Sequence, residues 1–279
     1  MALLSPCRAD CIVFDVDGVL INGTVSFRAV VSKCIPLYWS DVLGLDADCD
    51  TDAGEYYMAA KLYSSYNNDY DLVWALLSLT AASGQEKLSA AFPSLEKWQA
   101  ALAEAGSEGL AWFSRTCGNV VDRNIVQGVC TELYFGSADE REKKSFCGLL
   151  KQPVEPCRRL EKALFTTRWD KLPLPVGIYS GRYRNEIRAA LETLGWSDFP
   201  SDRIVSVEMC RKPDPSGMKY LCNAMGCSWP LYLGDAESDR MVMKNFGRGD
   251  FIAIGPLLKN SAIRFTTAAD ALRAVLGVV

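Results

Sequence analysis

The sequence predicts an α/β protein with a doubly wound parallel sheet and an all-helical domain inserted after the first strand. Short apolar strands alternate with helical patterns over residues 11–23 and about 172–279, as in parallel sheets. Residues 24–170 show helical periodicity and almost no convincing strand. Two carboxylates spaced i, i+2 directly follow the first strand. We therefore expect a core domain of residues 1–23 and 171–279 and an inserted helical domain of residues 24–170.

The predicted elements of the core follow from apolar runs and their punctuation. The first strand leads through Ile12-Val-Phe14 into Asp15. Glycines at 195 and 226 are predicted to end two of the helices. The later strands are expected at residues 176–180, 203–207, 231–234 and 251–254, with helices between them and at 238–246 and 268–276.

The middle of the chain is predicted to be helical. Apolar residues at helical spacing mark one helix around residues 72–77 and another around residues 95–102. Two more helices are expected over residues 119–135 and 155–169. A helical insertion of this length is best explained as a separate domain.

Composition excludes several classes of function. The net charge of −4 offers no basic footprint for nucleic acid, and no apolar run reaches the ~18 residues of a membrane span. The chain has no histidine, which excludes a Ser-His-Asp triad, a Cys-His dyad and a His-ligated metal. Eleven scattered cysteines without a Cys-x-x-Cys pair are typical of reduced, buried thiols, so we expect a cytoplasmic protein.

Polar motifs follow the predicted strands where ligands bind in doubly wound sheets. Buried carboxylates are rare unless they are paired or bound to a metal, so the acids after the first strand need partners. The motifs, in chain order, are Asp15-Val-Asp17-Gly18, Ser180-Gly181-Arg182, Cys210-Arg-Lys212-Pro-Asp-Pro215 and Gly234-Asp235-Ala-Glu-Ser-Asp239.

This ordered set resembles the four signature motifs of the haloacid dehalogenase (HAD) superfamily. The large insertion between the first and second motifs is similar to the helical C1-type cap of subfamily IA, although it is longer than usual. The resemblance implies a Rossmann-like core and a magnesium-dependent phosphatase acting on a small phosphorylated metabolite such as a sugar or polyol phosphate. The second acid of the first motif, Asp17, favours phosphate-ester chemistry over dehalogenation.

The resemblance also implies catalytic roles. Asp15 would attack phosphorus and form an aspartyl-phosphate, while Asp17 would protonate the leaving group and later activate water. Lys212 would neutralise charge beside Asp15, and Ser180 and Gly181 would bind the phosphoryl oxygens. A phosphoryl transfer needs these parts, namely a nucleophile, neutralised oxygens and a proton source.

A magnesium ion is the implied cofactor. Its ligands would be the Asp15 side chain, the Asp17 backbone carbonyl and Asp235, with Asp239 in or just behind the coordination shell. Hard oxygen ligands of this kind suit Mg²⁺.

The substrate contacts are less well defined by the sequence. Arg182 is a candidate at the mouth of the site, with helix-start surface placement as the alternative. The cap segment Asn67-Asn68-Asp69 could bind a polyol, or its amides and carboxylate could cap a helix. A phosphomutase of the β-phosphoglucomutase type and a non-catalytic phosphometabolite-binding protein remain as alternative functions.

Overall fold

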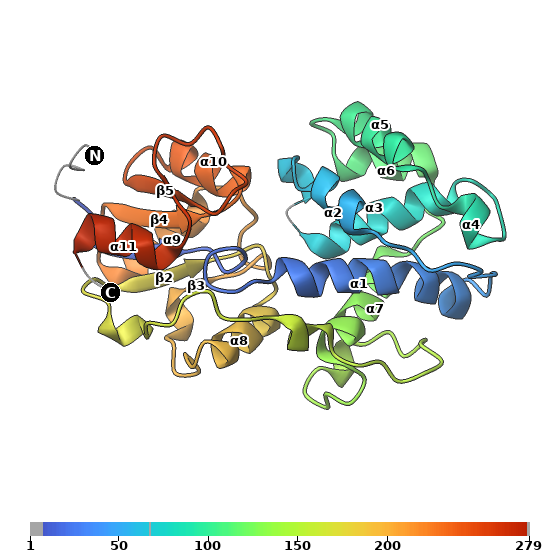
Figure 1. Ribbon diagram of the computed structural model, residues 1–279, viewed down its shortest axis with the longest axis horizontal. Coiled ribbons are helices and arrows are strands. Elements are labelled where there is room, and N and C mark those ends of the chain that lie inside the picture. Colours follow the sequence, from blue (N-terminus) through green and yellow to red (C-terminus); the bar gives the residue numbers. More distant parts are fainter. Residues whose placement is uncertain (1–7, 67, 278–279) are drawn as a thin grey trace. The chain divides into compact units, whose positions relative to one another are not determined.

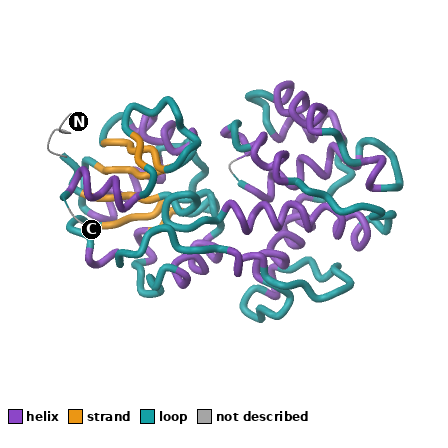
Figure 2. The backbone as a smooth tube through the Cα atoms, viewed as in Figure 1, coloured by secondary structure: helices purple, strands orange, loops and turns teal. Residues whose placement is uncertain are grey.

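The computed structural model describes residues 8–66 and 68–277. Contacts divide the chain into two compact units, one of Met1–Thr24 with Glu161–Val279 and the other of Val25–Leu160. The boundary at Glu161 lies upstream of the predicted one at residue 171. Figure 2 shows the strands in the first unit and helices with loops in the second.

The first unit contains one six-stranded sheet in which every pairing is parallel, with the order β3-β2-β1-β4-β5-β6. This confirms the predicted doubly wound α/β fold. The strands are β1 Cys11–Phe14, β2 Val176–Tyr179, β3 Ile204–Val205, β4 Pro230–Gly234, β5 Asp250–Ile254 and β6 Arg264–Phe265. Strand β6 has only two residues, too few for an alternation or an apolar run, and the sequence did not predict it.

Helices cover both faces of the sheet (Figure 1). Ile12 and Phe14 of β1 pack on one side with α8 (Arg184–Thr193) and α11 (Ala268–Leu276). Val13 points to the other side, where α9 (Ser216–Met225) and α10 (Glu237–Phe246) pack. Successive residues of a strand point to opposite faces, so a strand buried on both sides is apolar throughout.

The second unit is built from helices. Its α-helices are α1 Thr24–Leu37, α2 Gly54–Ala60, α3 Asp69–Ala81, α4 Leu88–Ala91, α5 Leu95–Ala105, α6 Leu110–Cys117 and α7 Arg123–Phe135. Shorter helical turns lie at Tyr38–Val42, Ser64–Tyr66, Lys143–Ser145 and Cys157–Leu160. Within the described residues, no helix is both long enough and apolar enough to cross a bilayer.

The helix predicted over residues 155–169 is wrong. That segment contains only a 3₁₀ turn at Cys157–Leu160 and the start of another at Trp169–Lys171. Its backbone pairs instead with the loop after β1: the N–H of Asn22 donates to the carbonyl of Lys162, and the N–H of Leu164 donates to that of Leu20, at 2.9 and 2.8 Å. These long-range bonds replace the i→i−4 bonds that the apolar spacing suggested.

Candidate active site

The parallel strands bring three of the predicted residues to one edge of the sheet. Phe14 of β1 pairs with Ile178 of β2 on one side and with Leu233 of β4 on the other. Asp15, Ser180 and Asp235 directly follow these three strands, so they emerge at neighbouring carboxyl ends. The N–H of Asp15 donates to the carbonyl of Leu233 at 2.9 Å, which fixes this edge. Ligands bind at such an edge in doubly wound folds.

Lys212 joins two acids at this edge. Its Nζ lies 2.9 Å from Oδ1 of Asp15 and 2.6 Å from Oδ1 of Asp239, and its side chain is only 1% exposed. Burial by itself would lower the pKa of Lys212, but Asp15 and Asp239 outweigh burial and raise that pKa above its ordinary value. Lys212 is therefore a fixed, buried positive charge beside the Asp15 carboxylate.

Asp239 uses both carboxylate oxygens inside the protein. Oδ1 accepts hydrogen bonds from Lys212 and, at 2.7 Å, from the hydroxyl of Tyr232. Oδ2 accepts from the backbone N–H groups of Asp235 and Ala236 at 3.1 and 3.0 Å. Asp239 thus positions Lys212 and the loop that carries Asp235.

Three carboxylates crowd this edge. Oxygen atoms of Asp15, Asp235 and Asp239 lie within 4.8 Å of one another. Burial raises the pKa of Asp15 to about 7, with Lys212 opposing the rise, and burial and the neighbouring acids also raise the pKa of Asp235. Lys212 supplies one positive charge against three acids, and the donors are hard oxygens, so the residues present fit a magnesium ion.

Gly18 makes room for Asp235. Its φ of +69° is in the left-handed region, and a Cβ there would meet Oδ2 of Asp235 at 2.2 Å. The glycine after Asp17 is therefore required by the approach of two loops, and any side chain at residue 18 would displace Asp235.

The metal-free protein should lose stability as pH rises. The folded pKa of Asp15, about 7, lies above its ordinary value of 3.8, so its protonated form favours folding and that contribution is lost as pH rises through 7. Between about pH 5 and pH 8 we expect the free energy of unfolding to fall by about 2–3 kcal/mol. Denaturant unfolding with a chelator measures it. Mg²⁺ should restore stability at the higher pH, and a metal-free stability that is flat or rises over this range would contradict the prediction.

Asp17 is held by an arginine. Nε and Nη2 of Arg182 donate to the two carboxylate oxygens of Asp17 at 2.9 and 2.7 Å. Nη2 also donates to Oε1 of Glu161 at 2.8 Å, and both Arg182 and Glu161 have side chains 1% exposed. The guanidinium of Arg182 is therefore already hydrogen-bonded to Asp17 and Glu161. This favours a role for Arg182 in positioning Asp17, rather than the predicted contact with substrate.

Gly23 allows this arrangement. A Cβ at residue 23 would meet Oδ1 of Asp17 at 1.8 Å and Nη2 of Arg182 at 2.3 Å. Any side chain at residue 23 would break the bidentate contact between Asp17 and Arg182.

Ser180 is buried at the end of β2. Its Oγ accepts a hydrogen bond from the N–H of Arg182 at 3.2 Å, and its own N–H donates to the carbonyl of Val205 at 3.0 Å. The hydroxyl proton can still donate to a phosphoryl oxygen. Gly181 lies between Ser180 and Arg182 and is half-buried.

The candidate residues of the cap lie in the second unit. Oδ1 of Asn68 accepts from the N–H groups of Tyr70 and Asp71 at 3.0 and 3.1 Å and thereby caps α3. Asp69 forms an ion pair with Lys61 at 2.7 Å. Asn67 lies outside the described residues. The helix-capping alternative therefore accounts for Asn68.

The sequence does not predict that Glu161 and Tyr232 contact residues of the site. Glu161 lies in the segment assigned to a cap helix, where an acid is typical of a solvated face. Tyr232 lies in an apolar strand and looks like a core aromatic. The role of Glu161 can be expected only once the fold shows that Arg182 is buried, because a buried arginine needs acidic partners.

Comparisons with known proteins agree with this geometry. A family model described as haloacid dehalogenase-like hydrolase matches residues 9–247. No curated protein shows significant sequence similarity to the chain.

Solved structures share the fold. Phosphatase Tt82 from Thermococcus thioreducens is 23% identical, with 89% of this chain and 94% of that chain covered and a TM-score of 0.63. A predicted phosphoglycolate phosphatase from Haemophilus somnus is 13% identical, with 95% and 97% covered and a TM-score of 0.50. A HAD family hydrolase from Deinococcus radiodurans with bound phosphate and sodium is 14% identical, with 97% and 96% covered and a TM-score of 0.50. With the family match across most of its length, the chain belongs to the haloacid dehalogenase-like hydrolase family.

Proposed function

We propose that this hydrolase is a Mg²⁺-dependent phosphatase that cleaves a small phosphate monoester, such as a sugar or polyol phosphate, through an aspartyl-phosphate. The observation that carries the proposal is the buried Lys212, whose Nζ bridges Asp15 and Asp239 at the carboxyl edge of the sheet. A lysine at this point supplies charge for a phosphoryl group that approaches Asp15. None of the ten described cysteines forms a disulfide, which supports a cytoplasmic location.

Asp15 is the proposed nucleophile. Its carboxylate oxygen attacks phosphorus, the bond from phosphorus to the ester oxygen breaks, and the alcohol leaves. Lys212 neutralises charge on the transferring group, and Ser180 and the Gly181 backbone bind its oxygens. Water then attacks phosphorus, releases phosphate and regenerates Asp15.

Asp17 is the proposed proton carrier. It donates a proton to the leaving alkoxide in the first step and takes one from water in the second. Arg182 donates one hydrogen bond to each oxygen of Asp17, which leaves a second lone pair on each oxygen for the transferred proton. The Asp17–Arg182–Glu161 arrangement therefore sets the orientation from which the proton is delivered.

The residues that would hold magnesium are Asp15, Asp235 and the backbone carbonyl of Asp17, with Asp239 behind them. The ion would supply positive charge between the phosphate and the crowded carboxylates. Asp239 acts on this site through its bonds to Lys212 and to the backbone of residues 235–236.

A panel of phosphate esters tests the proposed function. Phosphate release should require Mg²⁺, occur with at least one sugar or polyol phosphate, and be absent from the Asp15→Asn protein. A coupled isomerisation assay on the same sugar phosphates would reveal a mutase. Binding of phosphate esters without turnover by the wild-type protein would favour the binding protein instead.

Replacing Glu161 with glutamine should impair proton delivery selectively. The variant keeps the shape but removes one charge that holds Arg182, so we expect kcat for an alkyl phosphate to fall about 10-fold. With 4-nitrophenyl phosphate, whose leaving group needs no proton, the rate of 4-nitrophenolate release in a single turnover should change less than about twofold. Steady-state kinetics on the alkyl phosphate and single-turnover absorbance of 4-nitrophenolate measure the contrast.

The matched control is Glu155→Gln, which alters an exposed glutamate of the second unit that pairs with Arg159. It should leave both substrates unaffected. Equal losses in the alkyl phosphate kcat and in single-turnover release of 4-nitrophenolate by Glu161→Gln would mean that Glu161 has only a structural role.

A further inference from the structure

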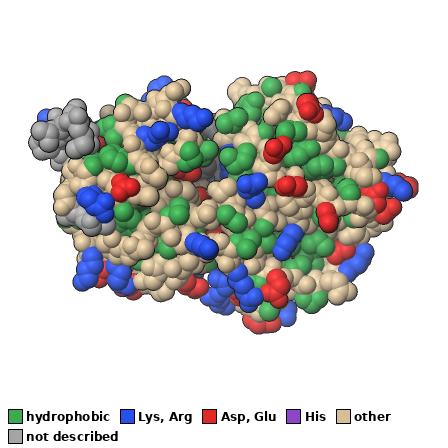
Figure 3. Space-filling model, viewed as in Figure 1, with side chains coloured by type: hydrophobic (Ala, Val, Ile, Leu, Met, Phe, Trp, Pro, Cys, Tyr) green, Lys and Arg blue, Asp and Glu red, His purple; other side chains and the backbone are tan. Residues whose placement is uncertain are grey.

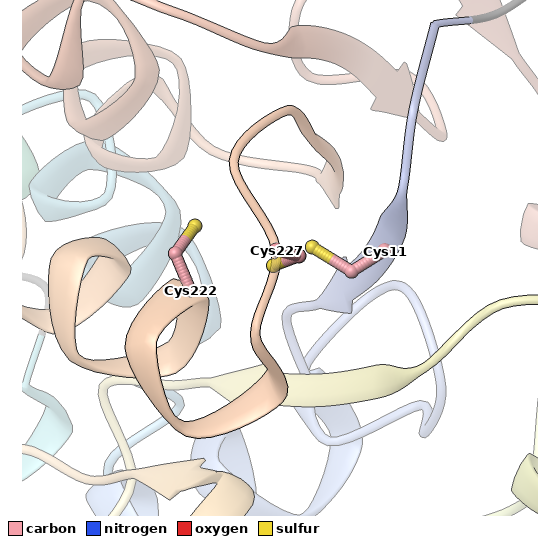
Figure 4. A group of neighbouring side chains, drawn as sticks. All are labelled: Cys11, Cys222 and Cys227. Carbon is pink, nitrogen blue, oxygen red and sulfur yellow. The ribbon is translucent and has the colours of Figure 1, made fainter.

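Three cysteines from separate segments meet at the opposite end of β1 from Asp15. Cys11 begins β1, Cys222 lies in α9, and Cys227 follows that helix (Figure 4). Their sulfur atoms lie within 4.8 Å of one another. Within residues 8–66 and 68–277, this is the one such group made of thiols alone. The cluster could not be predicted from the sequence, because Cys11 is more than 200 residues from the other two cysteines.

The fold holds the cysteine cluster in a defined geometry. Gly226 ends α9 in the left-handed region, and the N–H of Cys227 donates to the carbonyl of Cys222 at 2.9 Å. The carboxylate of Asp10 accepts from the backbone N–H groups of Ser228 and Trp229, both at 2.8 Å. The turn that carries Cys227 is therefore fastened to the residue before Cys11.

The spacing of the sulfur atoms matches the needs of a thiolate-bound metal. Zinc binds thiolate sulfur at about 2.3 Å, so tetrahedral ligands lie about 3.8 Å apart. Sulfur atoms that already lie within 4.8 Å reach that spacing through side-chain adjustments. Cys227 is half-buried, which provides a path for entry, whereas Cys11 and Cys222 are buried.

Simple core packing explains the cluster less well. Cys34 and Cys130 of the second unit are an example of simple core packing. These two buried thiols, one from each of two helices, lie with their sulfur atoms 3.6 Å apart. The first-unit cluster adds a third thiol, and Cys227 is partly exposed to solvent.

We propose that Cys11, Cys222 and Cys227 bind a thiophilic divalent cation of the zinc type at a second site, separate from the carboxylate site. On binding, the three thiols release their protons to solvent and three sulfur–metal bonds form. With no histidine in the chain, water completes the shell. The ion would tie the start of β1 to the end of α9, so its effect is on stability and not on the reaction at Asp15.

Cadmium titration of the reduced, full-length protein tests the proposal. Excess Mg²⁺ saturates the carboxylate site, and the thiolate-to-cadmium charge-transfer absorption in the ultraviolet reports sulfur ligation only. We expect one Cd²⁺ per chain, with excess Zn²⁺ competing for the same site. Cys222→Ser and Cys227→Ser should weaken binding by roughly a hundredfold or more, because even the loss of a residue that only hydrogen-bonds to a metal ligand costs about 10–100-fold. Cys34→Ser, in the second unit, should bind cadmium like the wild type.

A measurement on the wild-type protein tests the proposal even if the cysteine variants do not fold. X-ray absorption of the zinc-loaded protein should give three sulfur neighbours at about 2.3 Å. Zinc should also raise the unfolding temperature without changing phosphate release. The absence of a charge-transfer band, fewer than three sulfur neighbours, or equal loss of binding in Cys34→Ser would overturn the proposal.

Discussion

Replacing Asp15 with asparagine should lower phosphate release by at least about 10⁴-fold on every substrate, because loss of a nucleophile removes the covalent route altogether. Asparagine has nearly the same shape, so the β1 edge and its bond to Leu233 should persist. Substrate affinity should change far less than kcat. Initial rates of phosphate release with saturating Mg²⁺ measure the effect.

The control is a separate single variant that loses another carboxylate charge and keeps Asp15. Asp48→Asn removes an exposed carboxylate of the second unit whose partner is Ser89, and its activity should remain that of the wild type. An Asp15→Asn protein with more than a few per cent of wild-type activity would mean that another group attacks phosphorus.

Replacing Asp17 with asparagine should slow turnover of alkyl phosphates by about 10²–10⁴-fold, the range expected for loss of a general acid–base. The first step should survive with 4-nitrophenyl phosphate, whose leaving group departs without a proton, while attack of water on the phosphoenzyme stays slow. A rapid burst of 4-nitrophenolate followed by slow turnover is therefore expected in stopped-flow absorbance.

The burst amplitude should approach one equivalent of enzyme and vanish in the Asp15→Asn/Asp17→Asn double variant. A steady-state rate with 4-nitrophenyl phosphate that stays at the wild-type value would place Asp17 outside the second step and contradict its role as the base toward water.

The core could be predicted from the sequence because its signals are local. The apolar runs at β2, β4 and β5 and the helix that ends at Gly226 each lie within a short window. Residues 155–169 could not be predicted, since their backbone partners are Leu20 and Asn22, far away in sequence. The two residues of β6 carry too little pattern to be distinguished from a loop.

The candidate site also contains residues that could be predicted from the sequence and residues that could not. Asp15, Asp17, Ser180, Lys212 and Asp235 follow strands that the sequence defines, so their grouping could be predicted. The contacts of Arg182 could not be predicted, because its partner Glu161 comes from a segment that the periodicity assigned to the cap. The cysteine cluster is invisible for the same reason: only the pairing of β1 within the sheet and the packing of α9 place Cys11 near Cys222.

The most direct test of the central claim is to identify the phosphorylated residue. Asp17→Asn protein with Mg²⁺ and 4-nitrophenyl phosphate is quenched in acid within the burst, and peptides are analysed by mass spectrometry. We predict one phosphoryl group on the peptide of residue 15, located on Asp15 and absent from the double variant. Phosphate release without such a label, or a phosphoryl group on any other residue, would contradict the proposed aspartyl-phosphate mechanism.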